Sequence, residues 1–164
     1  MKNKLFLICP SSHLEHFLGM RYKNAYFLTA LAAVFRLREG GYAEELIGFL
    51  ERESVEEVIV VNDVACPFIE SVLLKQQGYG TYAEEVLVDL LVDNYAEVIS
   101  CGAVEAQKAR LAALNVQRQM RQLLGIGYFQ QQVVLQKMKV GGLVTSRAAG
   151  KVTEVKLHKA TISV

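Results

Sequence analysis

The sequence lacks the long apolar run and the excess of one charge that several classes of protein require. No stretch reaches about 18 apolar residues, so no segment is expected to span a membrane. Lysine and arginine nearly balance aspartate and glutamate, and the net charge of +1 offers no electrostatic argument for binding nucleic acid or an anionic membrane surface. Four basic residues are expected on the solvated face of one helix: Lys108, Arg110, Arg118 and Arg121. We therefore expect neither nucleic acid nor a membrane as a partner.

Cysteine is also scarce, with three in the chain. An odd, small number does not make a disulfide framework, and we expect a reducing, cytoplasmic location. The apolar run over residues 5–8 is too short for a signal peptide and is stopped by Pro10. The sequence also lacks a phosphate-binding Gly-x-x-x-x-Gly-Lys-Ser/Thr motif and a complete dinucleotide fingerprint.

What is present indicates a globular chain. Hydrophobic residues make up 52% and charged residues 21% of the 164 residues, which is enough apolar surface to bury a substantial core. We find no internal repeat and no linker. The length then predicts a single domain over residues 1–164.

The alternation of short apolar runs with helical patterns predicts an α/β fold. We expect strands over residues 4–8, 25–28, 57–61, 96–100, 133–144 and 152–157. We expect helices over residues 42–52, 67–76, 82–92 and 104–124, helical structure in at least part of 29–38, and a loop or short helix over 11–20. This order predicts a mostly parallel central sheet flanked by helices, with an antiparallel C-terminal edge.

Two cysteines follow two of the predicted strands. Cys9 ends the first apolar run, and Cys66 follows the run over 57–61, with Asp63 three residues before it. Because the carboxyl ends of parallel strands border one crevice, these three residues are expected to meet there, as a soft metal site or a reactive dithiol. Cys66 also precedes a predicted helix, whose N-terminus would favour its thiolate. Simple packing of each cysteine is the structural alternative, and we favour it for Cys101.

At these positions the chain resembles the β-class carbonic anhydrases. That family carries Cys-x-Asp-x-Arg after its first strand and His-x-x-Cys after a later one, where this sequence reads Cys9-Pro-Ser-Ser-His13 and Asp63-Val-Ala-Cys66. Asn115-Val-Gln-Arg-Gln119 matches a late Asn-Val-x-x-Gln motif of the family, and glycines at 141, 142 and 150 fit its last strands. The resemblance covers residues 5–157.

The resemblance implies a zinc site in which Cys9 and Cys66 are ligands and Asp63 stands where the family has histidine. Zinc accepts carboxylate oxygen, but two thiolates and a carboxylate leave the site at a net charge of −1. Zinc hydration chemistry depends on lowering the pKa of bound water to about 7, and a more electron-rich zinc does this less well. We therefore expect carbon dioxide hydration to be weak or absent, and we assign no catalytic residue.

Two further positions bear on that site. Ser11 and His13 replace the aspartate and arginine of the family's first motif. His13 could supply a further ligand and so close a structural zinc site. His16 has no counterpart in the motif, and His158 is expected to be exposed in the tail.

The resemblance also implies that the chain forms a homodimer. It further implies a small anion, such as bicarbonate, as a ligand. Two alternatives remain open on the same fold. One is a non-catalytic module that binds an anion or small molecule in the crevice. The other is a thiol redox sensor, which requires the Cα atoms of Cys9 and Cys66 to lie within about 7 Å of each other.

Overall fold

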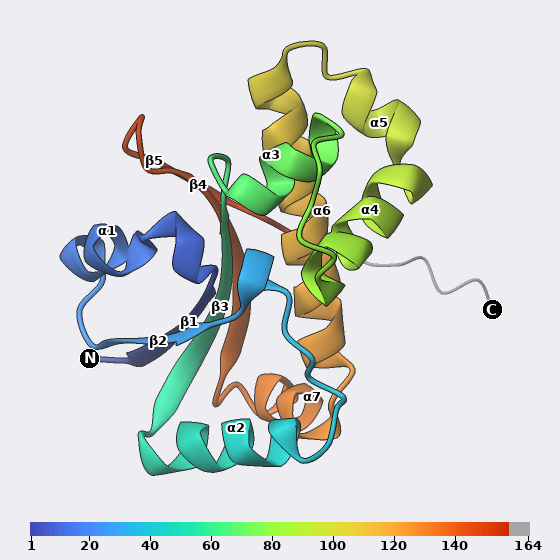
Figure 1. Ribbon diagram of the computed structural model, residues 1–164. Helices are drawn as coiled ribbons and strands as arrows, with labels where there is room; N and C mark the ends of the chain where they lie inside the picture. Colours follow the sequence, from blue (N-terminus) through green and yellow to red (C-terminus); the bar gives the residue numbers. More distant parts are fainter. Residues whose placement is uncertain (158–164) are drawn as a thin grey trace.

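The structure, a computed structural model, describes residues 1–157 and contains a five-stranded sheet with the order β2-β1-β3-β4-β5 (Figure 1). The first four strands in this order are parallel, and β5 pairs antiparallel with β4. Their bounds are β1 Asn3–Ile8, β2 Ala25–Thr29, β3 Val55–Asp63, β4 Lys139–Ser146 and β5 Lys151–Glu154. The predicted α/β fold with an antiparallel C-terminal edge is thus confirmed.

Helices pack on both faces of this sheet. They are α1 Leu14–Arg21, α2 Tyr42–Arg52, α3 Pro67–Leu73, α4 Tyr82–Asp93, α5 Tyr95–Ile99, α6 Val104–Leu124 and α7 Gly127–Val134, with short 3₁₀ turns η1 Pro10–Ser12 and η2 Leu31–Ala33. Figure 1 shows α1 on one face and α6 on the other. Alternate side chains of β1 divide between the faces, since Phe6 and Ile8 pack with α1 and Leu5 and Leu7 pack in the larger core.

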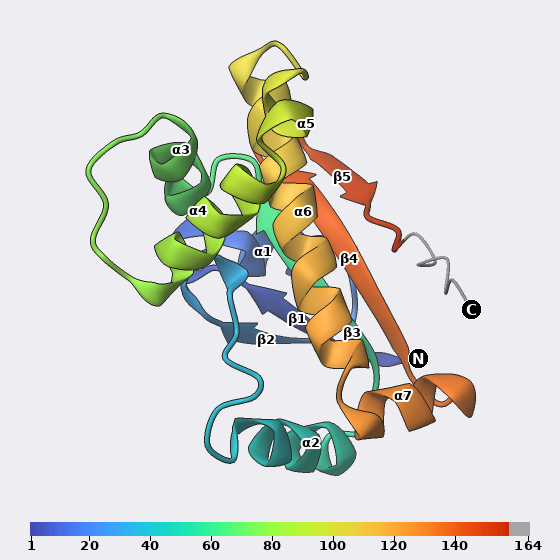
Figure 2. The ribbon, with the colours of Figure 1, turned by 90° about the vertical axis from the view of Figure 1, so that its right-hand side faces the viewer.

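The long helix α6 runs along the sheet over β3 and β4 (Figure 2). Its apolar face buries Leu111, Val116, Met120 and Leu123 at helical spacing, which explains why this segment folds as predicted. Gly142 of β4 lies directly beneath it. A Cβ atom at Gly142 would lie 2.4 Å from Val116 Cγ1 and 2.5 Å from Met120 Sδ, so the helix approaches the sheet as closely as glycine allows.

Several predicted elements differ from the structure. Residues 96–100 were expected to form a strand, but Tyr95–Ile99 is helix α5, in which only Val98 is buried. One buried side chain suits a single helical turn and does not give the two-residue alternation of a strand. The expected strand over 133–144 begins only at Lys139, because helix α7 occupies Gly127–Val134.

The segment over 29–38 contains only the turn η2. Ala32 and Ala33 both have left-handed backbone angles, with φ of 55° and 54°, which no α-helix accommodates. The helix expected over 67–76 ends at Leu73, and Lys75 beyond it has φ of 54°.

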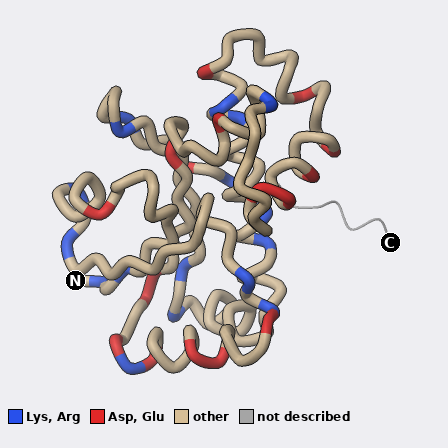
Figure 3. The backbone as a smooth tube through the Cα atoms, in the orientation of Figure 1, with Lys and Arg blue, Asp and Glu red and all other residues tan. Residues whose placement is uncertain are grey.

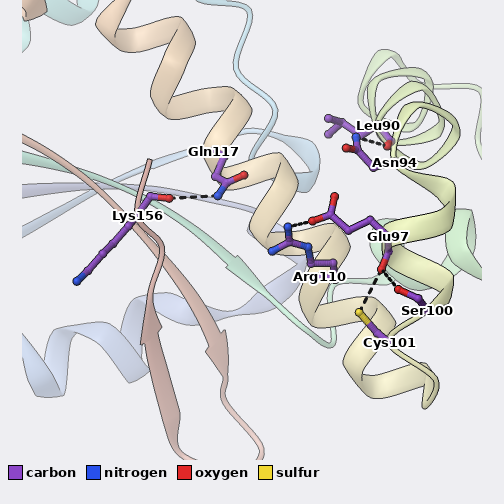
Figure 4. A network of polar contacts seen from close by, with 8 residues as sticks. All are labelled: Leu90, Asn94, Glu97, Ser100, Cys101, Arg110, Gln117 and Lys156. Atoms are coloured by element: carbon purple, nitrogen blue, oxygen red, sulfur yellow. Dashed lines mark hydrogen bonds and ion pairs between the residues drawn. The ribbon is translucent and has the colours of Figure 1, made fainter. Parts of the chain in front are cut away.

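Charges of both signs are interspersed along the chain (Figure 3). The basic residues of α6 were expected on a solvated face, and this is wrong for Lys108, which is buried. Lys108 Nζ lies 3.0 Å from Glu105 Oε1 and 3.7 Å from Glu70 Oε1. Arg110 forms an ion pair with Glu97 of α5 (Figure 4). Within residues 1–157, no helix combines the length and apolar character needed to cross a membrane.

Candidate functional site

Cys9 and Cys66 lie at the carboxyl ends of the neighbouring strands β1 and β3. Cys9 follows Ile8 and begins the turn η1, while Cys66 closes a tight turn after β3 and precedes Pro67, the first residue of α3. The Cys66 amide donates to the Asp63 carbonyl at 3.0 Å, which fixes that turn. Both cysteines are fully buried, and the interaction between their side chains is the largest cause of the shift in the pKa of each. The structure therefore brings the two sulfurs together in the crevice.

The sulfur of Cys9 accepts a hydrogen bond from the Ala32 amide at 3.2 Å. Interactions with Ser11 and with Cys66 also favour its charged form. These bonds stabilise the thiolate. They lower the pKa of Cys9 to about 6, with the Cys66 bond contributing most and burial acting in the opposite direction.

Cys66 has the opposite protonation preference. Its bond to Cys9, its burial and the negative charge on Cys9 all raise the pKa of the Cys66 thiol. The amides of Phe68 and Ile69 at the start of α3 act in the opposite direction, as expected for a helix N-terminus, but they are outweighed. The two thiols therefore titrate as one coupled pair, with Cys9 shifted towards the thiolate and Cys66 towards the thiol.

A buried amide network positions η2 against Cys9. Asn115 Nδ2 donates to the Ala32 carbonyl at 2.8 Å and to Asn62 Oδ1 at 2.5 Å, and Asn62 Nδ2 also donates to the Ala32 carbonyl at 3.2 Å. One turn further along α6, Gln119 Oε1 accepts from the Phe35 amide at 3.1 Å. These bonds hold the left-handed residues of η2 so that the Ala32 amide reaches Cys9.

Sequence reasoning matched the motif residues Asn115 and Gln119 to the family without assigning their role, and it missed Asn62 and Ala32 as parts of the site. A signal existed on α6, where two amide side chains four residues apart lie on the otherwise apolar face. Buried amides need partners, so their position indicates that a neighbouring backbone segment is held there.

Asp63 is buried, but its carboxylate is already hydrogen bonded. Oδ2 accepts from Thr145 Oγ1 at 2.7 Å and from the Arg147 amide at 2.9 Å, and Oδ1 accepts from the Ala65 amide at 2.9 Å. The side chain thus ties the end of β3 to the end of β4. Within the described part of the chain, no group of three His, Cys, Asp or Glu side chains is arranged to hold a metal ion. The zinc site of Cys9, Asp63 and Cys66 that the resemblance implies is thus not preformed in these residues.

The other predicted site residues lie as follows. Ser11 is exposed, and its interactions with Cys9 help to lower the pKa of that thiol. His13 is exposed, has φ of 50°, and its carbonyl accepts from Arg147 Nη1 at 3.4 Å. His16 is exposed on α1, and His158 lies outside the described residues.

Packing was the wrong expectation for Cys101. It is exposed in the turn after α5, and its thiol donates to the Glu97 carbonyl at 3.4 Å (Figure 4). The error follows from the misassigned strand over 96–100, because the end of a buried strand would have placed this thiol in the core.

Two hollows flank the strand β2, and they share Tyr42 and Glu45 of α2. The larger, of about 680 Å³, lies between η2 and the N-termini of α2 and α4, where the Arg36 guanidinium stacks 4.2 Å from the Tyr82 ring centre. The smaller, of about 240 Å³, is lined by Phe27, Leu28 and Phe49 together with other apolar residues. Cys9 and Cys66 line neither hollow.

Comparison with known proteins identifies the fold. Neither a family model nor a curated protein matches the sequence. Among solved structures, a β-carbonic anhydrase of Sordaria macrospora superposes with a TM-score of 0.80 at 15% identity, covering 97% of this chain and 83% of the other. CafA, a β-carbonic anhydrase of Aspergillus fumigatus, gives a TM-score of 0.80 at 19% identity, covering 97% and 77%.

A third solved structure has the same fold. The Coccomyxa β-carbonic anhydrase, solved with acetazolamide, gives a TM-score of 0.74 at 15% identity and covers 94% of this chain and 72% of the other. These identities are low, so the likeness concerns the architecture. From β1 to β5, this chain has the fold of the β-carbonic anhydrases.

Proposed function

We propose that this chain is a single β-carbonic-anhydrase-like domain whose site has been remodelled around two thiols and does not hydrate carbon dioxide efficiently. The bonding of Asp63 carries the proposal. Its two oxygens accept three hydrogen bonds from Ala65, Thr145 and Arg147, and these bonds direct the carboxylate towards β4. Releasing it towards the sulfurs would leave buried donors without partners, which costs about 1–3 kcal/mol for each.

Zinc is the metal that the fold and the two sulfurs suggest, because thiolates are ligands that it favours. Cys9 and Cys66 suit a soft cation. In this arrangement Asp63 does not serve as a third metal ligand beside the two sulfurs. His13 is exposed, and its carbonyl accepts a hydrogen bond from Arg147. The residues therefore do not fit the family's zinc site, and we route no hydration step through a metal. Binding of bicarbonate or another small anion in the crevice stays a prediction.

The proposal is tested on protein purified without added metal. We expect a carbon dioxide hydration rate equal to the uncatalysed background and much less than one zinc per chain. Asp63→His replaces the hydrogen-bonded carboxylate with the nitrogen ligand of the family and is expected to raise the bound zinc towards one per chain. Cys101→Ser, which changes an exposed thiol, is the matched control and should leave the zinc content unchanged.

A wild-type hydration rate typical of zinc hydratases, lost in Cys66→Ser, would contradict the proposal. Asp63→His also removes the acceptors for Thr145 and Arg147, so its thermal unfolding must be recorded beside its zinc content.

We also propose that the chain self-associates, at least as a homodimer. The Sordaria macrospora proteins with this fold are described as tetrameric. Within residues 1–157, β2 is an edge strand that pairs only with β1, and the smaller, apolar hollow lies beside it. An unpaired edge next to apolar surface favours contact with another chain. A cytoplasmic location remains the proposal that the odd, small number of cysteines supports.

A further inference from the structure

We propose that the groove between helices α3 and α4 binds an amphipathic helix of a partner protein, one whose apolar stripe is flanked by lysine or arginine. The groove has a volume of about 460 Å³. The two helices lie side by side on the face of the sheet that α6 covers (Figure 2). The inference concerns a surface away from the two buried cysteines and does not depend on the proposed function.

The lining of the groove is apolar over most of its length. Val72 of α3, Val88, Leu91 and Val92 of α4, and Tyr95 of α5 all contribute to it. The relative exposure of Val88 is 45%, that of Val92 is 67% and that of Tyr95 is 50%, although α4 already buries a separate set of apolar side chains in the core. Neighbouring apolar side chains that a helix leaves in solvent mark a surface for interaction.

A row of carboxylates runs beside this apolar surface. Glu85, Asp89 and Asp93 are exposed and spaced four residues apart, so they lie in one row on α4, next to the row of Val88 and Val92 (Figure 3). Within residues 1–157, none of the three forms an ion pair. Like charges four residues apart destabilise a helix. A partner with positive charge beside the row would remove this repulsion.

The charge around the groove is also one-sided in the sequence. Residues 76–107 contain six acidic residues and no lysine, arginine or histidine. Three of the six are bonded within the chain: Glu84 accepts from amides before α4, while Glu97 and Glu105 pair with basic residues of α6. Lys75, in the turn after α3, is the one base that lines the groove within the described residues. Electrostatic complementarity therefore favours a basic partner over an acidic one.

The shape of the surface favours a helix as the occupant. α4 has 12 residues and is therefore about 18 Å long, which matches between three and four turns of a helix laid along it. A helix of this kind places apolar side chains in a groove at helical spacing and keeps its charges at the rim. A second copy that used the same face about a two-fold axis would bring the two acidic rows together, so charge disfavours it.

The experiment uses a fluorescein-labelled helical peptide of about 14 residues, with leucine along one face and lysine on both flanks. A second peptide carries glutamate in place of each lysine. Fluorescence anisotropy should show that the lysine peptide binds one per chain in the micromolar range and that the glutamate peptide does not bind. Added salt should weaken the binding, because exposed charges are screened.

Two variants of α4 locate the binding. Val88→Ser/Val92→Ser removes apolar surface from the groove, and Glu85→Gln/Asp89→Asn/Asp93→Asn removes the charges of the row. Each is expected to weaken binding of the lysine peptide by roughly tenfold, since several small contributions from exposed groups add up. All five side chains are exposed, so both proteins should fold, and near-ultraviolet circular dichroism establishes that they do.

The matched control removes three exposed charges from another helix. Glu44→Gln/Glu45→Gln/Glu51→Gln in α2 changes the net charge by the same amount and should leave the affinity within about twofold. Equal weakening by the α2 and α4 charge variants, equal binding of both peptides, or no binding of the lysine peptide overturns the inference. So does a sedimenting mass that falls to that of a monomer in Val88→Ser/Val92→Ser, because the groove would then be an interface between copies.

Discussion

The contact between Gly142 and helix α6 gives a sharp test of the packing. A methyl group at Gly142 would lie 2.4 Å from Val116 Cγ1, where carbon atoms normally sit about 3.5–4.0 Å apart. The overlap is therefore more than about 1 Å. Met120 Sδ, at 2.5 Å, can move because methionine is flexible, but Val116 is β-branched and fully buried in the middle of α6.

The magnitude follows from two opposing effects. Overpacking of this kind costs about 1–3 kcal/mol, and replacing glycine with alanine returns about 0.4–1 kcal/mol through the unfolded chain. Gly142→Ala is thus expected to lower the free energy of unfolding by about 1–2 kcal/mol, or the melting temperature by roughly 2–8 °C for a domain of this size. Thermal and urea unfolding, followed by circular dichroism, measure both quantities.

Gly141 provides the control, because a Cβ atom there meets nothing within 4 Å. Gly141→Ala should leave the stability unchanged or slightly raised. Adding Val116→Ala to Gly142→Ala removes the clashing methyl, so the double variant should be more stable than the sum of the single effects by about 0.5 kcal/mol or more. Equal destabilisation by Gly141→Ala and Gly142→Ala would refute the packing argument.

Two further predictions concern the thiol pair and self-association. Because the Cys66 bond contributes most to lowering the pKa of Cys9 to about 6, Cys9 should be a thiolate at neutral pH. Ultraviolet titration of the thiolate should show a higher pKa for Cys9 in Cys66→Ala than in the wild type. The rise should be smaller in Cys66→Ser, because serine keeps a hydrogen-bond donor. A wild-type pKa near 9 for Cys9 would contradict the arrangement. Sedimentation should give at least the mass of a dimer. Leu31→Asp, beside the larger hollow, should shift the sedimenting mass towards that of a monomer. Met20→Asp, on α1 at the other face, should leave this mass unchanged. A monomeric wild type would contradict self-association.

The fold was largely predictable because its strands and helices have strong local patterns. The Val-Ile-Val-Val run of β3 and the apolar repeat of α6 leave little ambiguity in period. Short elements were harder. α5 has five residues and one buried side chain, so its Ala-Glu-Val-Ile sequence suits a strand as well as a helix, and only the packing against α6 decides.

The location of the site could be predicted from the sequence, but the orientation of its side chains could not. Cys9 and Cys66 could be assigned to one crevice because parallel strands end at one edge. The orientation of Asp63 could not, since it depends on Thr145 and Arg147, more than 80 residues away in sequence. The left-handed angles of Ala32 and Ala33 were also hidden, because alanine gives no signal for them and the bonds from Asn62, Asn115 and Gln119 enforce them.

The contact between Cys9 and Cys66 has a consequence for folding. The chain between them contains β2, α2 and β3, so the two sulfurs meet only after the parallel strands have paired. Such non-local pairing is slow, and it makes the thiol contact a late event.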